Sequence, residues 1–352
     1  MSIENGLLKM IVKFLLSFSD FDCMMTAIIL VNWNGADDTI ACLESLSRVE
    51  EPHFVVIADN DSSDDSVLRI QAWLDEHGQS NPTVKGYQLL TLDSNYGFAI
   101  GNNKALAVAM QRNPDYCMLL NNDTEVEPDF LKHLIAFAEE NREVKALSPC
   151  ICYHYDKEKV WFSGGQLTFG SRKNLYAEQQ KGSVGSAPFP ISFISGCALF
   201  FRPSLLNGQS ELLYEGFFFG EEDYEFSLRM RNEGVRMMCV PQSRIYHKVG
   251  SSQKRTNDAR GLGRAYMYYH NRLVCARLYY SSLQFLLIRW LSCPSCFKYF
   301  KRYTGSCRTA WRILRQLMRD VKVNDGFRYA EFSSLMFDNT YFSFDTSKKR
   351  AQ

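Results

Sequence analysis

At 352 residues, the chain is long enough for two domains or for one large domain with an appendage. Its composition, 46% hydrophobic and 22% charged, is that of a globular protein and excludes a wholly disordered chain. The net charge of +1 conceals an asymmetry: residues 251–322 contain 15 Lys and Arg against two acids, a balance of +13, which leaves −12 for the rest. We therefore expect an acidic body and a basic appendage that faces phosphates, anionic lipid or nucleic acid.

Residues 1–24 form an extension ahead of the expected fold. The apolar stretch 7–18 is interrupted by Lys9 and Lys13, is too short to span a bilayer and lacks a small-residue cleavage site. A weak amphipathic anchor remains an alternative to a plain extension. We expect one main domain over 25–250 and a basic, mainly helical region over 251–352.

Eleven cysteines, an odd number scattered along a chain of this size, do not indicate a disulfide framework, and reduced cytosolic thiols explain them better. The pair in "CPSC" at 293–296 lacks a second Cys or His pair at the spacing of a zinc site. The sequons at 60–62 and 122–124 would matter only in a secreted protein.

Four continuous apolar runs alternate with four segments of helical periodicity. The runs, which predict strands, are 26–32, 53–59, 87–92 and 116–120. The periodic segments, which predict helices, are 37–48, 64–75, 99–112 and 127–140. Asp64 and Asp65 signal the start of the second helix, and Pro128 lies in the first turn of the fourth. This alternation is typical of an α/β fold whose mostly parallel sheet has helices on both faces.

Each expected strand is followed by a polar cluster: "NWNGADD", "DNDSSDD", "DSNYGFAIGNN" and "NNDTEVEPD". Asn, Asp and Gly at any one of these positions can serve turn geometry alone. Because the carboxyl ends of parallel strands share one edge of a sheet, four such clusters predict a common polar ligand site. The glycines match neither a dinucleotide-binding fingerprint nor a P-loop. A nucleotide held by Asn and Asp, with a divalent cation bridging Asp123 and its phosphates, fits the pattern.

Read in order, these segments resemble the inverting glycosyltransferases of family 2. The further matching segments are "WFSGG", "FISGCALFFR", "FFFGEEDYEFSLRMRNEG", "HKVGSS" and "YYHNR", so that the resemblance covers about residues 26–275. It is strongest to the bacterial rhamnosyl- and galactofuranosyltransferase branch. The resemblance implies the nucleotide-sugar transferase (GT-A type, Rossmann-like) fold.

The resemblance also implies roles for the donor side. Asn32 and Asn34 would frame the base, and Asp59 and Asp61 would contact the base and ribose. The positions expected to line the rest of the nucleotide are Asn95, Gly97, Asn103 and Asn122.

Residues 121–123 occupy the family's Asp-x-Asp motif, with Asp123 as ligand of Mg²⁺ or Mn²⁺. The chain departs from the motif at Asn121, whose amide oxygen can bind a cation but brings no charge. The family places a histidine at His247 to bind the metal or the diphosphate, which would offset the missing acid.

The segment "GEEDYEFSLRMRNEG" predicts a helix that begins at Glu222. By spacing alone, its acids can complement the helix dipole, and Glu225 with Arg229 can form an ordinary i,i+4 pair. The resemblance implies instead that Asp223 is the general base and Glu222 its neighbour or an acceptor contact. Residues that would shape the sugar pocket are Trp161, Gly164, Gly165, Ser195 and Gly196.

Residues 308–319 place four arginines on one helical stripe and Trp311, Leu314 and Met318 on another. With the apolar segment 285–291, this pattern indicates either a helix lying in a membrane interface or a soluble helix packed on the catalytic domain. The apolar segment is too short to span a bilayer. Nucleic acid is a poor partner because no recognised binding module is present.

The resemblance thus implies inverting transfer of rhamnose, galactofuranose or a similar hexose from a UDP- or dTDP-sugar. The acceptor would be a hydroxyl of a glycan or lipid-linked molecule in cell-surface polysaccharide synthesis. The expected location is the cytoplasm, with peripheral attachment to the inner face of the cell membrane. Two alternatives stay open: a non-catalytic nucleotide-sugar-binding or membrane-associated scaffold protein, and a nucleotidyltransferase, although the Gly-rich loop and phosphate-binding lysine of the latter are missing.

Overall fold

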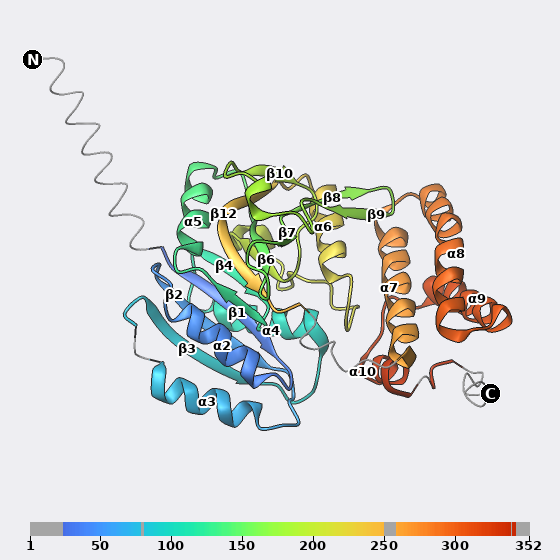
Figure 1. The fold of residues 1–352 in the computed structure, drawn as a ribbon, viewed down its shortest axis with the longest axis horizontal. Coiled ribbons are helices and arrows are strands. Elements are labelled where there is room, and N and C mark those ends of the chain that lie inside the picture. The colour runs from blue at the N-terminus through green and yellow to red at the C-terminus, as the bar shows by residue number, and fades with distance from the viewer. Residues whose placement is uncertain (1–23, 79–80, 250–257, 339, 343–352) are drawn as a thin grey trace, which may run out of the picture.

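A computed structural model describes residues 24–78, 81–249, 258–338 and 340–342 (Figure 1). In this part of the chain a mixed sheet carries helices on both faces, and a group of C-terminal helices lies at one end of the sheet (Figure 1). The α/β class predicted from the sequence, with a C-terminal helical segment, is confirmed.

The large sheet has the strand order β10-β12-β6-β11-β4-β1-β2-β3, with β5 paired to β12 and β7 paired to β6. Its strands are β1 Thr26–Asn32, β2 His53–Asp59, β3 Val84–Thr91, β4 Tyr116–Leu120, β5 Thr124–Val126, β6 Ala146–Tyr153, β7 Val160–Phe162, β10 Phe189–Ile191, β11 Ala198–Phe201 and β12 Met237–His247. Strands β3, β2, β1 and β4 are mutually parallel, and β11 runs antiparallel to β4. A separate hairpin joins β8 Gly165–Thr168 to β9 Ser171–Asn174.

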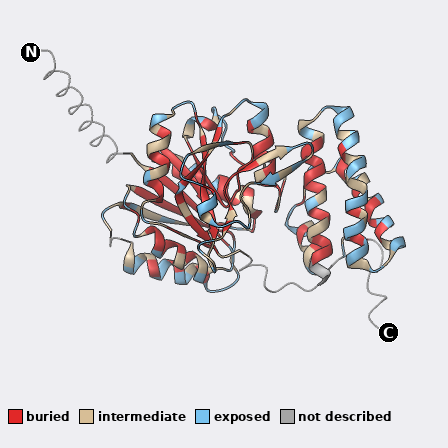
Figure 2. Ribbon diagram, turned by 45° about the horizontal axis from the view of Figure 1, so that its top comes forward, coloured by how far each residue is buried: buried red, intermediate tan, exposed pale blue. Residues whose placement is uncertain are grey.

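Helices cover both faces of this sheet because its central strands are apolar on both sides. The helices that precede the C-terminal helical group are α2 Ala36–Leu46, α3 Ser66–His77, α4 Gly97–Met110, α5 Phe130–Glu140 and α6 Glu222–Asn232. Ile28 and Leu30 of β1 pack in one core with α2, α3 and α5, while Ala27 and Ile29 pack in another with α4. Figure 2 shows the buried strands enclosed by helices whose outer sides are exposed.

The predicted strands 26–32, 53–59 and 116–120 coincide with β1, β2 and β4. The third begins earlier, at Val84, because its first residues extend the pairing with β2 although they lack a continuous apolar pattern. Three of the four predicted helices begin within two residues of the observed ones. The fourth, α5, begins at Phe130, three residues after its predicted start, because Glu127, Pro128 and Asp129 form the turn that leads into the helix.

The C-terminal helices form their own core. They are α7 Asp258–Tyr279, α8 Ser282–Thr304, α9 Cys307–Val323 and α10 Tyr329–Ser333, followed by a π-helical turn over Ser334–Asp338. Helix α9 buries Ala310, Ile313, Leu314 and Leu317 in this core. The interpretation of 308–319 as a membrane-interface helix is therefore wrong for its main apolar face, which packs within the helical group. No helix of the described segments is long and apolar enough to cross a membrane.

Candidate active site

A hydrogen-bonded network ties together the tips of β1, β2 and β4. Asn32 donates to the carboxylate of Asp59 over 2.7 Å and accepts from Thr39 Oγ1 over 2.8 Å. Asn122 in turn donates to Thr39 Oγ1 over 2.8 Å. The carboxylate of Asp59 also accepts from the backbone N–H and the hydroxyl of Ser62. The structure thus confirms that these strand tips converge.

Within this network, Asn32 and Asp59 are fully buried. The polar atoms of both side chains already form hydrogen bonds within the protein. These bonds fix the shape of the loop after β2 and leave little for a ligand to contact. Asn34 and Asp61 both have left-handed backbone, with φ of 51° and 61°. The exposed side chain of Asn34 accepts from the backbone N–H of Ser63, which fixes the β1 loop against the β2 loop. Asp61 is exposed beside them and available to a ligand.

The next group of predicted residues holds a loop that precedes α6. The carboxamide of Asn103 donates to the carbonyl of Leu213 and accepts from the N–H groups of Leu212 and Leu213. Gly97 has φ of +81°, and a Cβ there would lie 2.2 Å from the carbonyl oxygen of Phe218. These two residues, expected to line the nucleotide, instead position the segment 212–218.

Asn95 acts in the same region. Its side-chain oxygen accepts from Asn60 Nδ2 and from the N–H of Gly97, each over 3.0 Å, and the residue is buried. Asn95 therefore fixes the turn into α4. The segment "SNYGFAIGNN" thus forms the start of α4, and the start of α4 supports the loop that leads to Asp223.

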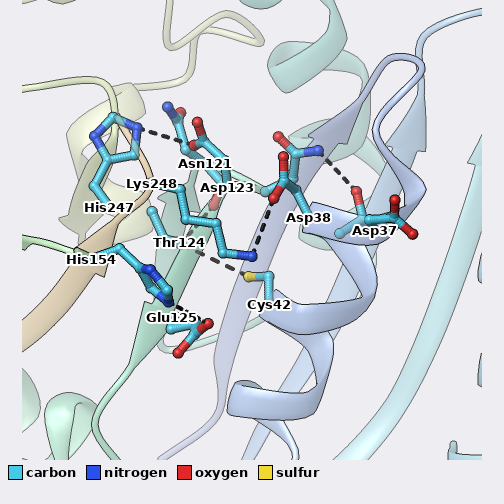
Figure 3. Close-up of polar contacts among 12 residues, drawn as sticks. Asp37, Asp38, Cys42, Asn121, Asp123, Thr124, Glu125, His154, His247 and Lys248 are labelled. Carbon is cyan, nitrogen blue, oxygen red and sulfur yellow. Dashed lines mark hydrogen bonds and ion pairs between the residues drawn. The ribbon is translucent and has the colours of Figure 1, made fainter. Parts of the chain in front are cut away.

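Asp123 and His247 meet at the turn after β4. The Oδ1 atom of Asp123 lies 3.1 Å from Nε2 of His247 (Figure 3). The two are brought together by antiparallel pairing of β5 with β12, in which His247 is opposite Thr124. Burial alone would lower the pKa of His247, but its contacts with Cys197 and with the Asp123 carboxylate raise it, and a cation would bind this imidazole only after the proton has left.

The side chains around this pair fit a hard divalent cation. The side-chain oxygen of Asn121 is buried and makes no hydrogen bond within the described residues. Carboxylate and amide oxygens with one imidazole are suitable ligands for Mg²⁺ or Mn²⁺. Among the described residues, no three His, Cys, Asp or Glu side chains form a complete metal site. Cations that bind nucleotide phosphates commonly take only one or two protein carboxylates, with phosphate and water completing the shell.

The segment 195–197 connects this turn to Asp223. The carbonyl of Cys197 accepts from the backbone N–H of Asn121 over 2.8 Å. One residue earlier, the N–H of Gly196 donates to Oδ2 of Asp223 over 3.4 Å. The carboxylates of Asp123 and Asp223 also both influence the pKa of the Cys197 thiol, which burial raises. Asp123, His247 and Asp223 therefore line one region.

Asp223 and Glu222 differ in environment. Asp223 is only partly buried, whereas Glu222 is buried and its Oε1 accepts from the N–H of Gly220 over 2.6 Å. Burial, with the nearby charge of Asp223, raises the pKa of Glu222 to about 8. Burial also raises the pKa of Asp223, although Arg172 and Arg272 act in the opposite direction. Asp223 is thus the carboxylate that a substrate could reach.

Residues 27–206, 180 of the 352, match the profile of Glycosyl transferase family 2. The chain belongs to this family. It is therefore a glycosyltransferase, as the sequence resemblance implied, and the match extends across the strand tips and the turn of Asp123. No curated protein matches the chain.

Several solved structures share the fold of this family 2 glycosyltransferase at low sequence identity. One is the mannosyltransferase PcManGT from Pyrobaculum calidifontis, solved with GDP-Man and Mn²⁺ (TM-score 0.51, 15% identity, 85% of this chain and 75% of that one). Another is GalNAc-T7 with UDP, GalNAc and Mn²⁺ (TM-score 0.52, 15% identity, 90% of this chain but 57% of that one). A third is TarS 1-349 of S. aureus (TM-score 0.50, 13% identity, 86% and 88%).

A buried ion cluster lies directly before the predicted base of this glycosyltransferase. The carboxylate of Glu221 accepts from Arg172 over 2.8 and 3.0 Å and from Arg272 Nε over 2.6 Å. The guanidinium of Arg272 lies 3.9 Å from the centre of the Tyr224 ring. Sequence reasoning missed all three charged residues. "YYHNR" belonged to the resemblance, but nothing local indicated that its arginine reaches a residue 51 positions away.

The predicted sugar-side residues lie around the same region. Trp161 packs edge-on against His247, with ring centroids 4.5 Å apart. Ser195 is buried and its Oγ accepts from the N–H of Cys197. A Cβ at Gly164 or Gly165 would collide with Ile191 or Phe193. These glycines therefore allow the start of β8 to pack closely on residues 191–193.

Proposed function

We propose that this family 2 enzyme moves a sugar from a nucleoside diphosphate donor to an acceptor hydroxyl with inversion, and that Asp223 is the general base. The observation that carries the proposal is the Gly196–Cys197 segment. It hydrogen-bonds the Asp223 carboxylate on one side and the Asn121–Asp123 turn on the other.

The reaction follows from this placement. Asp223 accepts the proton of the acceptor hydroxyl as the oxygen bonds to the anomeric carbon, on the face opposite the diphosphate. The bond from that carbon to the diphosphate oxygen breaks, and the diphosphate leaves with its electron pair. Asp123 and His247, with the side-chain oxygen of Asn121, would hold a divalent cation, which would supply positive charge for this leaving group.

Inversion is supported by the presence of one accessible carboxylate. Glu222 is buried and turned toward Gly220, so it does not form with Asp223 a close pair facing the substrate. A close pair is the arrangement by which retaining glycosidases form a covalent intermediate. A single base that activates the acceptor suits direct displacement.

The finer assignment rests on the sequence resemblance. We propose rhamnose, galactofuranose or a similar hexose as the sugar, UDP or dTDP as the nucleotide, and a glycan or lipid-linked acceptor in cell-surface polysaccharide synthesis. We also propose a cytoplasmic location with peripheral attachment at the inner face of the membrane. The structural neighbours were solved with different nucleotides, GDP and UDP, and so favour no single donor.

A donor screen tests the proposal. The full chain with Mn²⁺ is incubated with UDP-, dTDP- and GDP-sugars, and release of free nucleoside diphosphate is measured. The anomeric configuration of the product from the active donor is then read by NMR. Release that needs the cation, with an inverted product, is the expected result. A retained configuration would refute the mechanism, and donor binding without release would favour the scaffold alternative.

A further inference from the structure

Helix α8 carries a row of large apolar side chains on its solvent side. The row, called here the α8 stripe, consists of Leu283, Leu286, Leu287, Trp290 and Leu291. Between 46% and 78% of the surface of each residue is exposed. These positions recur at i, i+3, i+4, i+7 and i+8, which places them along one face of the helix.

The stripe is the outer face of a helix whose inner face is already packed. Ile288, Cys296 and Phe300 of α8 are buried in the C-terminal core. Figure 1 shows α8 at the end of the molecule, with α7 between it and the sheet. A soluble helix with one packed face ordinarily presents polar residues on the other, so a second apolar face indicates a partner.

The helix that carries the stripe and the helix after it are strongly basic. Residues 282–323, which span α8 and α9, contain nine Lys and Arg and one acid, Asp320, a balance of +8. Beyond the stripe, the exposed residues of α8 include Lys298 and Lys301, and α9 exposes Arg308 and Arg315. Asp320 accepts hydrogen bonds from two tyrosines inside the helical group.

These features favour an anionic lipid surface over a second copy of the chain. If two copies joined through their stripes, two helix pairs with a net charge of +8 each would face one another. Their electrostatic repulsion opposes such a dimer. Anionic headgroups instead attract each basic residue near the surface by about 1 kcal/mol. Trp290, and Trp311 of α9, which packs on Phe297, provide the amphipathic rings that favour a bilayer interface.

We propose that α8 lies in the interface of an anionic membrane, with the α8 stripe inserted among the acyl chains and the basic residues of α8 and α9 on the headgroups. The helix that inserts a row of apolar side chains is thus α8, because most apolar residues of α9 are buried in the helical group. This proposal rests on the peripheral attachment proposed above and names the helix that makes it, but it does not depend on the proposed transfer chemistry.

The hairpin β8–β9 connects α8 to the active site. At its turn Phe169 is exposed and packs edge-on against Tyr280, while Gly170 approaches Ile288 of α8. Two residues further along, Arg172 binds Glu221 next to Asp223. The hairpin thus joins the inner face of α8, the face opposite the stripe, to the turn that holds the base, so one element links the lipid-binding helix to the active site.

Vesicle co-sedimentation of the full chain tests the proposal. Wild type is compared with a variant carrying Leu287→Gln, Trp290→Gln and Leu291→Gln, exposed positions whose replacement should leave folding intact. On phosphatidylcholine vesicles with about 30% phosphatidylglycerol, we expect the variant to bind at least about tenfold more weakly. The control, Leu68→Gln with Tyr155→Gln, removes exposed apolar groups outside the C-terminal helices and should bind like wild type.

Variants with reversed charge provide a second test of the proposal. Lys298→Glu with Lys301→Glu should abolish the preference for anionic over pure phosphatidylcholine vesicles. Donor cleavage without vesicles should be unchanged in all these variants, which separates failure of this proposal from failure of the proposed reaction. Wild-type binding by the stripe variant would overturn the proposal, as would a wild-type dimer in sedimentation velocity that the stripe variant converts to monomer.

Discussion

The guanidinium of Arg272 on α7 lies 2.6 Å from the carboxylate of Glu221, and both side chains are almost fully buried. Glu221 has a left-handed backbone, with φ of 72°, which costs a non-glycine residue free energy and persists only where neighbours enforce it. The adjacent Asn271 donates to the carbonyl of Gly220 over 2.8 Å. The C-terminal helices thus hold the turn from which Asp223 projects.

Replacing Arg272 should therefore impair turnover more than donor binding. In Arg272→Gln the Glu221 carboxylate loses one of its two cations, so we expect kcat to fall about 10- to 100-fold with donor KM changed less than about threefold. Loss of a buried ion-pair partner also costs about 3–5 kcal/mol of stability, so thermal unfolding is measured in parallel. Arg277→Gln, on the same helix but paired with exposed Asp325, is the control.

The pH profile distinguishes electrostatic positioning from general loosening. Arg272 lowers the pKa of Asp223 and Glu221 raises it. A base works when deprotonated, so Arg272→Gln should move the acidic limb of kcat/KM to higher pH and Glu221→Gln should move it to lower pH. Shifts in the same direction would contradict the proposed coupling.

Asp223→Asn keeps the size of the side chain but cannot accept a proton. We expect kcat to fall about 10²- to 10⁴-fold, the range for loss of a general base, with donor affinity by calorimetry near wild type. Glu233→Gln, an exposed change just after the same helix, should have no effect. Turnover near wild type in Asp223→Asn would remove this residue from the mechanism.

The sequence predicted the sheet well because the burial of parallel strands leaves continuous apolar runs, as in β1, β2 and β4. It also predicted that the strand tips converge, since parallel strands share an edge. The meeting of Asp123 with His247 depends on the pairing of β5 with β12, whose paired residues are about 120 positions apart, and it was expected only from the resemblance. No local pattern carries that contact.

Asn103 and α9 show where sequence reasoning fails. A polar residue near a strand tip suggests a ligand contact. The side-chain oxygen of Asn103 instead accepts hydrogen bonds from backbone N–H groups about 110 residues away. Helical periodicity correctly indicated that α9 is amphipathic. It does not say whether the apolar face meets protein or lipid, because both environments bury the same side chains.

Asn121→Asp restores the missing charge of the metal motif. If residue 121 faces the cation, the added carboxylate should lower the Kd for Mn²⁺ by about tenfold, measured by calorimetry with and without nucleoside diphosphate. Asn113→Asp adds the same charge at an exposed position outside the site and serves as control. Unchanged affinity in Asn121→Asp would show that residue 121 does not face the cation.

Gly97→Ala tests whether α4 supports the catalytic loop. The new Cβ would meet the carbonyl oxygen of Phe218 at 2.2 Å, at a φ of +81°. We expect a stability loss of about 1–3 kcal/mol from backbone strain and a fall in kcat, because the loop leading to Asp223 must shift. Gly182→Ala, where a Cβ would meet nothing within 4 Å, should change neither quantity.

Glu222 gives a stability signature that depends on pH. Burial, with the charges of Asp223 and Glu221, raises its pKa from 4.5 to about 8, so the folded protein binds an extra proton between these values. The stability that Glu222 contributes is therefore fully present below its unfolded-state pKa of 4.5, and it is lost as the pH rises through its folded-state pKa of about 8. Glu222→Gln mimics the neutral acid and should gain melting temperature over wild type as pH rises from about 5 to about 9, with activity near neutral pH within a few-fold. A constant difference across this range would show that Glu222 is ionised in the folded enzyme.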